Sequence, residues 1–430
     1  MDTSRATSIF DQTIRFLLCV LVFWLPYSPA VIEVTVILSV VLWFVKRSFI
    51  FCSLKNESSF FQRIKKAWQL PSSPLNSSIY VFLLVSFIGV VLSDLPAVAW
   101  QGFFRKTLEW FVIFFLVLEV FREKKHFVVL LWVFLITAFA TVLDGWLQYY
   151  VLGKDIFNGY PSAPGYPLQR VTASFNAPGG MAAYLTILIP FLLSLGNIGN
   201  IKRNSRWLLS LIILFFLAAM WLLVLTFTRG AWLGTVVGLL FFIAIMFLKT
   251  EKSGTILWGG ILFSFLLFIG GIFITFLQEK GFGLSEGSTI SWRLEIWQGV
   301  LKMIQDKPFF GHGINTFMTV FYQKYLEGKY EPTYAHNCYL QLGAESGWLG
   351  LIAFLWLLGK LFWISIQRIW ENSNWAVVQV GLLAGIIAFL VHSFFDTNFY
   401  SLKLVAYLWF AIGALIALSN LSQHTTVSNQ

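Results

Sequence analysis

Charged residues are scarce in this sequence. Asp, Glu, Lys and Arg together make up 12% of its 430 residues, against about 25% in an average soluble domain. Hydrophobic residues make up 58%. This composition excludes a soluble globular domain, and we expect an integral membrane protein.

Cysteines are also few, and several chemical motifs are missing. Cys19, Cys52 and Cys338 have no metal-binding spacing, and only Cys338 is expected near the outer face, so neither a disulfide framework nor a zinc site is supported. The sequence lacks a glycine-rich loop followed by lysine, and no serine or cysteine stands in a nucleophile elbow. We therefore expect no metal, no cofactor and no ATP chemistry.

Long apolar runs fill most of the chain. A helix needs about 20 apolar residues to cross a bilayer core. Twelve stretches are candidates: about 14–26, 29–45, 79–95, 107–121, 127–150, 174–196, 207–228, 230–248, 255–277, 348–366, 376–394 and 399–419. The first two are short and also fit a re-entrant pair. The sequence predicts an all-α polytopic membrane protein with about 12 transmembrane helices.

Basic residues concentrate in alternate loops, which are cytoplasmic by the positive-inside rule. They are Lys46, Arg47, Lys55, Arg63, Lys65, Lys66, Arg122, Lys124, Lys125, Lys202, Arg203, Arg206, Lys249, Lys252 and Arg368. With twelve spans both termini lie inside. The formal net charge of +10 is then a topology signal beside anionic lipid, and nucleic-acid binding is the poorer explanation.

Two features near the amino terminus concern the membrane as well. The first apolar run is followed by no small-residue cleavage site, so we expect no signal peptide and a retained anchor. The basic stretch from Lys55 to Trp68 carries Phe60, Phe61 and Ile64, and it is typical of an amphipathic helix lying on the cytoplasmic leaflet.

One polar interruption, Gln278 to His336, divides the chain. We expect transmembrane helices 1–9 in residues 1–277, and a long outward-facing loop in residues 278–347 between helices 9 and 10. Residues 348–430 then hold helices 10–12 and a cytoplasmic tail. Because the rest is lipid-embedded, aqueous chemistry is expected at this loop.

Three arginines are expected at the outer face: Arg170, Arg229 and Arg293. For any one of them, snorkelling to lipid headgroups is an equally good explanation. As a group they favour binding of a phosphate anion, because the guanidinium is a planar fork that pairs with phosphate through two hydrogen bonds. Asn176 lies between Arg170 and a Pro-Gly-Gly break, which fits an irregular segment lining a polar cavity or a simple helix-start turn.

His336 is the candidate general base, because imidazole titrates near neutrality. A lone histidine at a helix start is more often structural. Its surroundings favour a functional role, because Glu345 follows in the next helix or turn. There its carboxylate is expected either to orient the imidazole or to pair with an arginine. His312 stands between two glycines, which favours a structural role in a tight turn.

The residues resemble those of the O-antigen ligase and O-antigen polymerase superfamily of bacterial envelope glycan transferases, and are closest to the ligases. The resemblance covers the span architecture and four motifs: Arg170 to Pro178, Thr228 to Gly234, the loop block from Arg293 to Phe317, and His336 with Gly347 in the ligase pattern His-x10-Gly. The ligase loop is often Arg-x3-Leu, whereas Trp297 stands at the fourth position here, so a polymerase remains an alternative.

The resemblance implies a function and a site. Arg170, Arg229 and Arg293 would bind the diphosphate of an undecaprenyl-linked glycan, His336 would be the base, and Asn176, Glu345 and Gly347 would complete the binding site. The acceptor would be a hydroxyl of lipid A core, in an inverting and metal-independent transfer. The protein would be a multi-pass inner (cytoplasmic) membrane enzyme whose site faces the periplasm.

Other functions stay open at this stage. The chain ends soon after its last span, which makes a protein acceptor a weaker expectation. A polymerase would use a second lipid-linked repeat unit as acceptor. A transporter is the alternative from another class, but transporter sites usually carry charges near the bilayer midplane, and here the expected midplanes hold almost none.

Overall fold

The computed structural model describes residues 3–54, 59–164, 169–196, 206–249, 270, 289–326, 332–371 and 375–427. Its α-helices are α1 (Thr3–Trp24), α2 (Pro29–Ser53), α3 (Phe60–Ala67), α4 (Asn76–Val91), α5 (Pro96–Gly102), α6 (Glu109–Val120), α7 (Lys124–Leu147), α8 (Pro178–Gly196), α10 (Arg206–Leu225), α11 (Arg229–Lys249), α13 (Thr289–Asp306), α14 (Phe317–Lys324), α15 (Cys338–Ile369), α16 (Ala376–His392) and α17 (Leu402–Val427). Short π or 3-10 segments are η1 (Phe103–Leu108), η2 (Gln148–Leu152), η3 (Ala173–Phe175) and η4 (Asn398–Tyr400).

The predicted all-α membrane architecture is confirmed. Eight described helices are long and apolar enough to cross a membrane: α1, α2, α7, α8, α10, α11, α15 and α17. Each predicted stretch coincides with a described helix except 255–277, which lies outside the described residues, so the count of twelve stays a prediction. Because α1 and α2 have 22 and 25 residues, each can cross alone, which disfavours the re-entrant pair.

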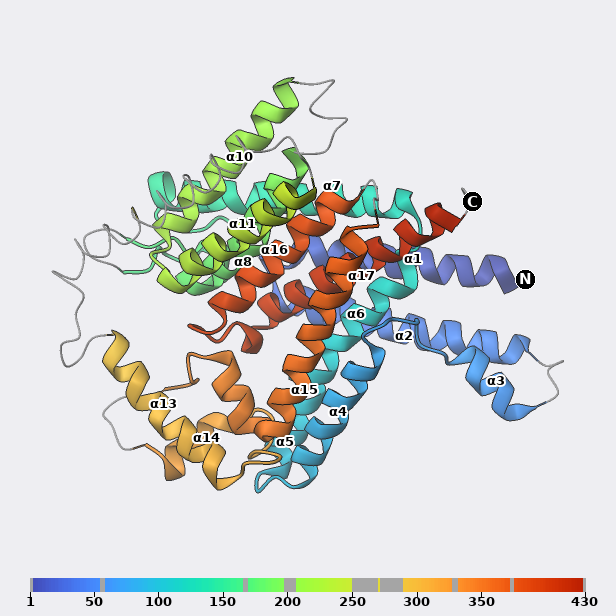
Figure 1. The fold of residues 1–430 in the computed structure, drawn as a ribbon, viewed down its shortest axis with the longest axis horizontal. Coiled ribbons are helices and arrows are strands. Elements are labelled where there is room, and N and C mark those ends of the chain that lie inside the picture. Colours follow the sequence, from blue (N-terminus) through green and yellow to red (C-terminus); the bar gives the residue numbers. More distant parts are fainter. Residues whose placement is uncertain are drawn as a thin grey trace.

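Helix α16 packs closely against both α8 and α11 (Figure 1). A Cβ atom on Gly234 would lie 2.3 Å from the carbonyl oxygen of Ala388, and one on Gly238 would lie 2.5 Å from that of Ala384. On the other face of α16, a Cβ on Gly385 would meet the backbone of α8 at 2.7 Å. Small residues let membrane helices approach until their backbones touch. These glycines therefore fix the spacing of α8, α16 and α11.

Helix α17 runs along α6 and buries an aromatic cluster between them. The Trp409 ring lies 4.5 Å from the Phe111 ring and 6.3 Å from the Phe114 ring, measured between centroids. The start of α1 and the end of α17 lie on the same side of the molecule (Figure 1). This placement agrees with the predicted topology, in which both chain ends share one face.

The described part of the predicted outer loop has a small core of its own. Helices α13 and α14 stand apart from the main bundle (Figure 1) and pack against the beginning of α15. Their shared core is formed by Ile296, Val300, Met303, Ile304, Phe317, Val320, Phe321, Tyr325, Ala335 and Ala344. The helix α15 begins at Cys338, inside the range 278–347 that the sequence analysis assigned to the loop.

Gly347 lies at a kink in α15, where its φ is +69°. A Cβ there would lie 2.2 Å from the carbonyl oxygen of Phe309. The preceding loop docks on the kink, since His312 N donates to Ala344 O at 3.0 Å and Gly313 N donates to Glu345 O at 2.9 Å. Only glycine fits this position without strain.

The described residues of the basic stretch confirm the amphipathic helix. In α3, Phe60 and Phe61 are 60% and 80% exposed, while Ala67 is buried against the bundle. Trp68 follows and packs edge-on against Trp43 of α2, with ring centroids 6.0 Å apart. The helix is therefore held to α2 and presents its aromatic side chains outward, as expected at a membrane surface.

We predict that Gly234→Ala destabilises the protein by about 1–3 kcal/mol, the usual cost of overpacking. The added methyl group meets backbone, which has no alternative rotamer. Thermal unfolding in detergent measures the change. Gly359→Ala is the matched control, because a Cβ there meets nothing within 4 Å; its higher helix propensity should leave it neutral or more stable. Equal melting temperatures for both variants would contradict the packing argument.

Candidate active site

The turn between α16 and α17 is fastened to the segment that begins α15. Cys338 N donates to Ser393 O at 2.9 Å, and Cys338 Sγ donates to the main-chain oxygen of Asp396 at 3.2 Å. Phe399 N in turn lies 3.3 Å from Cys338 Sγ. These bonds hold His336, two residues before Cys338, beside the carboxylate of Asp396.

Asp396 lies between two imidazoles. His336 Nδ1 is 3.8 Å from Asp396 Oδ1, and His392 Nε2 is 3.7 Å from Asp396 Oδ2. Asn398 Nδ2 lies 3.2 Å from His392 Nδ1, so this nitrogen accepts and the His392 proton stands on Nε2, facing the carboxylate. Burial alone would raise the pKa of Asp396, but His336, His392 and the N–H of Thr397 outweigh it and lower the pKa to about 2.

Arg170 and Arg293 lie within electrostatic range of both Asp396 and Arg229. Burial lowers the pKa of Arg170 and of Arg293; in both, the negative charge of Asp396 acts against this effect and the positive charge of Arg229 adds to it. Arg229 and Asp396 are thus close enough to influence both other guanidinium groups. For Arg170 and Arg293 alone, the one carboxylate of Asp396 leaves an excess of positive charge, which suits the binding of a multiply charged anion.

Arg170 and Arg229 are brought together by the end of α10. Arg170 Nε donates to Thr226 O at 2.9 Å, and its Nη2 reaches Thr228 Oγ1 at 3.4 Å. The backbone of Arg170 also pairs with Ala163 in an antiparallel bridge. The guanidinium of Arg170 is therefore fixed beside the turn in which α11 begins with Arg229.

Two positions in the arginine motifs require glycine, because other parts of the chain lie too close for a side chain. A Cβ on Gly230 would lie 2.7 Å from Phe395 Cβ, and one on Gly179 would lie 2.3 Å from Asp396 Oδ2. Glycine after Arg229 and glycine in the Pro-Gly-Gly break thus allow α11 and α8 to approach the turn that carries Asp396.

His336 is held in an uncommon backbone conformation. Its φ is +50°, a value that non-glycine residues adopt at a cost and that is frequent at functional sites. Trp292 meets the imidazole edge-on, with ring centroids 4.9 Å apart, and Trp297 Nε1 donates to Ala335 O at 2.9 Å. Helix α13, which carries Arg293, thereby fixes the imidazole, whose side chain stays 31% exposed.

The other predicted site residues have different surroundings. Glu345 is 1% exposed and accepts hydrogen bonds from Tyr400 OH at 2.9 Å and from Phe317 N at 3.3 Å. Asn176 is exposed, with φ +60°, at the start of α8, and Gly347 forms the kink described above. The structure brings Arg170, Arg229, Arg293, His336 and Asp396 into one region. Glu345 is buried and is linked to the segment of His336 through Gln341, whose Nε2 lies 3.4 Å from Glu345 Oε1 and whose Oε1 accepts from Ala335 N at 3.0 Å.

His312 is buried and structural, as expected. It is 2% exposed, and its Nε2 lies 3.1 Å from Met303 O. Among the described residues, no three His, Cys, Asp or Glu side chains are grouped as metal ligands would be.

The sequence analysis missed Asp396 and His392. The available signal was their spacing of four residues, which puts an imidazole and a carboxylate on one side of a helix end. Both stand near the outer end of the predicted span 376–394. Ionisable groups at such positions are rare and usually functional.

The family described as O-Antigen ligase matches residues 211–355, a range that includes Arg229, Arg293 and His336. The ComP-specific O-oligosaccharyltransferase of Acinetobacter baylyi is 24% identical over 346 residues, which cover 77% of this chain and 59% of the relative. The chain therefore spans less than two thirds of the length of that curated relative.

The network around Glu345 gives a prediction about stability. Glu345→Ala leaves Tyr400 OH and Phe317 N without their acceptor, and an unsatisfied buried donor costs about 1–3 kcal/mol. Glu345→Gln keeps one carbonyl acceptor and should lose less. Thermal unfolding in detergent compares the two variants; a glutamine variant as unstable as the alanine variant would contradict the hydrogen-bond account.

Proposed function

We propose that this chain, a member of the O-antigen ligase superfamily, transfers an O-antigen type glycan from an undecaprenyl diphosphate donor to a hydroxyl group of lipid A core. The site would face the periplasm from the inner membrane. The matches with the ligase family and with an oligosaccharyltransferase support transfer of a glycan in general. The undecaprenyl diphosphate donor, the lipid A core acceptor and the mechanism are our proposals.

The observation that carries the proposal is that Arg170 and Arg293 both lie within electrostatic range of Arg229 and of Asp396, the carboxylate beside His336. A lipid-linked diphosphate offers two phosphate groups at the membrane surface, and guanidinium forks match them in geometry and charge. During transfer, negative charge grows on the phosphate oxygen that leaves the sugar. Fixed guanidinium groups stabilise this charge without reorganising, which lowers the barrier.

His336 would remove the proton from the acceptor. Asp396 lies on the Nδ1 side of the imidazole at 3.8 Å and favours a proton there, so the lone pair of Nε2 is available. The acceptor oxygen gives its proton to Nε2 and attacks the anomeric carbon, while the bond from this carbon to the diphosphate oxygen breaks with its electron pair. A single displacement of this kind inverts the anomeric configuration.

A protein hydroxyl is a second candidate for the acceptor. The relative from Acinetobacter baylyi is named an O-oligosaccharyltransferase specific for ComP, and this name favours a protein hydroxyl as an alternative acceptor. The same site chemistry serves a sugar hydroxyl, a serine or threonine hydroxyl, or a second lipid-linked repeat unit. Only the surface that presents the acceptor differs among these reactions.

The decisive experiment is transfer by purified protein. We expect wild-type protein with undecaprenyl diphosphate glycan and lipid A core to form the ligated product in the presence of a chelator. His336→Ala should lower the rate by about 10²–10⁴-fold, the contribution of a general base. Arg229→Ala should lower it by about 10²–10³-fold, as loss of one oxyanion donor does.

Lys302→Gln is the charge control, because Lys302 is exposed on the helix α13 that also carries Arg293. It should transfer at the wild-type rate. Parallel reactions with a protein that exposes serine and threonine hydroxyls and with the lipid-linked glycan alone identify a protein acceptor or a polymerase. No product with any acceptor, or full activity without His336, would refute the proposal.

Asp396→Asn should lower kcat by about tenfold or more while changing KM little, because an amide no longer holds the imidazole in the productive tautomer. Asp94→Asn is the control, since Asp94 is a 58% exposed carboxylate that pairs with Lys307. The comparison is made on folded protein of equal melting temperature. If Asp396→Asn raised only KM, Asp396 would act in substrate binding and the orienting role would be wrong.

A further inference from the structure

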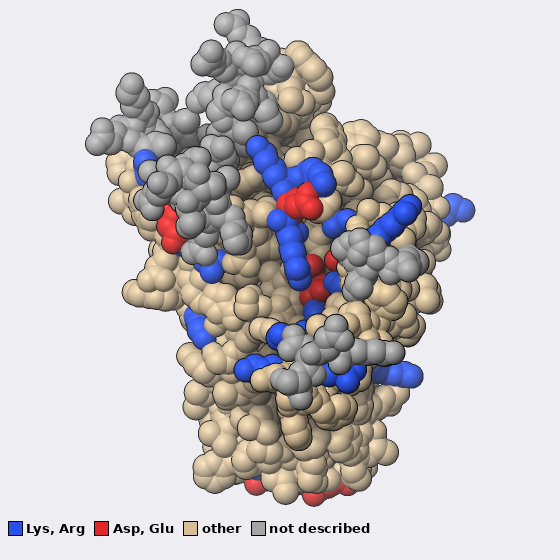
Figure 2. Space-filling model, turned by 90° about the vertical axis from the view of Figure 1, so that its right-hand side faces the viewer, with Lys and Arg blue, Asp and Glu red and all other residues tan. Residues whose placement is uncertain are grey.

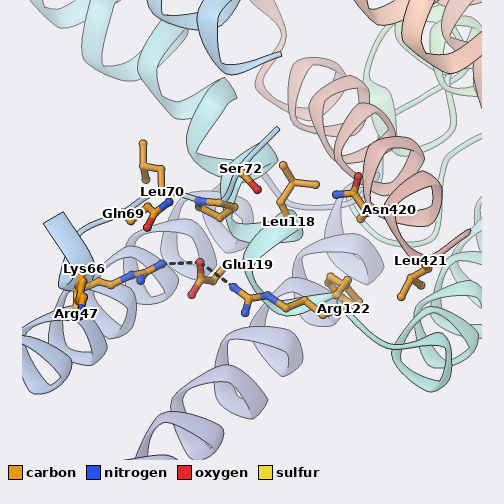
Figure 3. Close-up of a pocket in the computed structure, with 13 residues that line it drawn as sticks. Arg47, Lys66, Gln69, Leu70, Ser72, Leu118, Glu119, Arg122, Asn420 and Leu421 are labelled. Atoms are coloured by element: carbon orange, nitrogen blue, oxygen red, sulfur yellow. Dashed lines mark hydrogen bonds and ion pairs between the residues drawn. The ribbon is translucent and has the colours of Figure 1, made fainter. Parts of the chain in front are cut away.

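A second polar site lies at the opposite end of the bundle from Asp396. Helix α17 starts near Asp396 and reaches Asn420 after a rise of about 27 Å, which is close to the thickness of a bilayer core. There a cavity of about 420 Å³ opens between the ends of α2, α6 and α17 and the segment that follows α3. Its lining includes Arg47, Lys66, Glu119 and Arg122 (Figure 3).

The charges of this cavity are unequal. Glu119 is 2% exposed and is shared by three cations: Lys46 Nζ and Arg47 Nη2 each lie 2.6 Å from its oxygens, and Arg122 Nη2 lies at 3.4 Å. Lys46 also pairs with Asp11 at 2.5 Å. The two carboxylates, Glu119 and Asp11, thus face the three basic groups of Lys46, Arg47 and Arg122, and this cluster at the cavity keeps an excess of positive charge.

Arg47 has hydrogen-bonding capacity that the protein leaves unused. Its side chain is 9% exposed, and its guanidinium donates to Glu119 at 2.6 Å and to Ala67 O at 3.3 Å. The Nε of Arg47 has no partner among the described residues. Buried donors are nearly always satisfied, so an unsatisfied one in the wall of a basic cavity points to an acceptor that binds there.

The residues around the cavity indicate that it lies at the membrane interface. Lys66 belongs to the amphipathic helix α3, and the rim residues Gln69 to Ser72 follow it. The exposed Phe60 and Phe61 of this helix suit the interface between headgroups and acyl chains. The side of the molecule that carries α3, the start of α1 and the end of α17 shows Lys and Arg gathered over its middle (Figures 1 and 2). Basic pockets of this kind between membrane helices are suited to lipid headgroups.

We infer that this cavity binds a phosphate group, presented by the headgroup of an anionic phospholipid or by a soluble phosphate compound. Arg47 and Arg122 supply guanidinium forks and Lys66 supplies a point charge at the rim. Leu70, Leu118 and Leu421 lie among the lining residues and suit the glycerol and upper acyl carbons of a lipid. The site is separate from the arginines around Asp396 and does not depend on the transfer reaction.

The test uses the full chain, purified in a neutral detergent and stripped of lipid. Phosphatidylglycerol, phosphatidylcholine and inorganic phosphate are titrated separately, while bound lipid is counted by native mass spectrometry and the melting temperature is followed. The wild type should bind phosphatidylglycerol saturably and gain stability. The double variant Lys66→Gln with Arg122→Gln should bind about tenfold more weakly or worse, because two charge-assisted contacts are lost.

The matched control is Lys65→Gln with Lys124→Gln. It removes two exposed cations from neighbouring positions that do not line the cavity, so the net charge of the two double variants is equal. Both variants change exposed side chains and keep the pairs of Glu119 with Lys46 and Arg47. Equal weakening in the two variants, or equal retention of phosphatidylglycerol and phosphatidylcholine, would overturn the inference.

The titration with inorganic phosphate distinguishes a soluble phosphate compound from a lipid headgroup as the source of the anion. Saturable protection by inorganic phosphate that is lost in the Lys66 and Arg122 variant, without selective lipid binding, assigns the site to a soluble phosphate compound. Selective retention of phosphatidylglycerol assigns it to a lipid headgroup. Because the readout is binding, failure of this inference leaves the proposed transfer untouched, and failure of transfer leaves this inference untouched.

Discussion

Close contact between the backbones of α8, α16 and α11 is the constraint on which the rest of the structure depends. The turn after α16 carries Asp396, and it reaches the start of α8 and the start of α11 only because Gly179 and Gly230 have no side chains in the way. The site is assembled from distant parts of the chain, and this assembly requires that a few positions carry no side chain. This packing also positions Arg229, because Arg229 directly precedes Gly230.

This packing gathers like charges, and the fold compensates only in part. One carboxylate cannot neutralise both Arg170 and Arg293, and the positive charge of Arg229 acts on these two groups as well. His336 adds an uncommon backbone conformation at φ +50°. Strain and repulsion of this kind persist where the surrounding structure over-determines them. A bound anion offsets this repulsion.

The sequence predicts the helices well because their signal is local. Apolar runs define their own length, and the amphipathic helix α3 lies where the residue pattern placed it. Convergence of the site is not local, because it depends on which helix faces touch. Asp396 was missed since one carboxylate near a span end carries no pattern alone. Glu345 was expected beside His336, but α15 directs it toward Tyr400 and Phe317, on a different side from the imidazole.

The two ends of the bundle hold similar charge arrangements but differ in chemistry. At one end Arg170 and Arg293 lie within electrostatic range of Asp396, and at the other three cations pair with Glu119. The first has His336, an imidazole with a carboxylate on one side and an exposed edge on the other, whereas the described lining of the second contains no histidine. Guanidinium and ammonium groups hold an anion but take no proton at neutral pH. Excess positive charge alone therefore makes a binding site, and the oriented imidazole is what makes one of the two ends suited to proton removal.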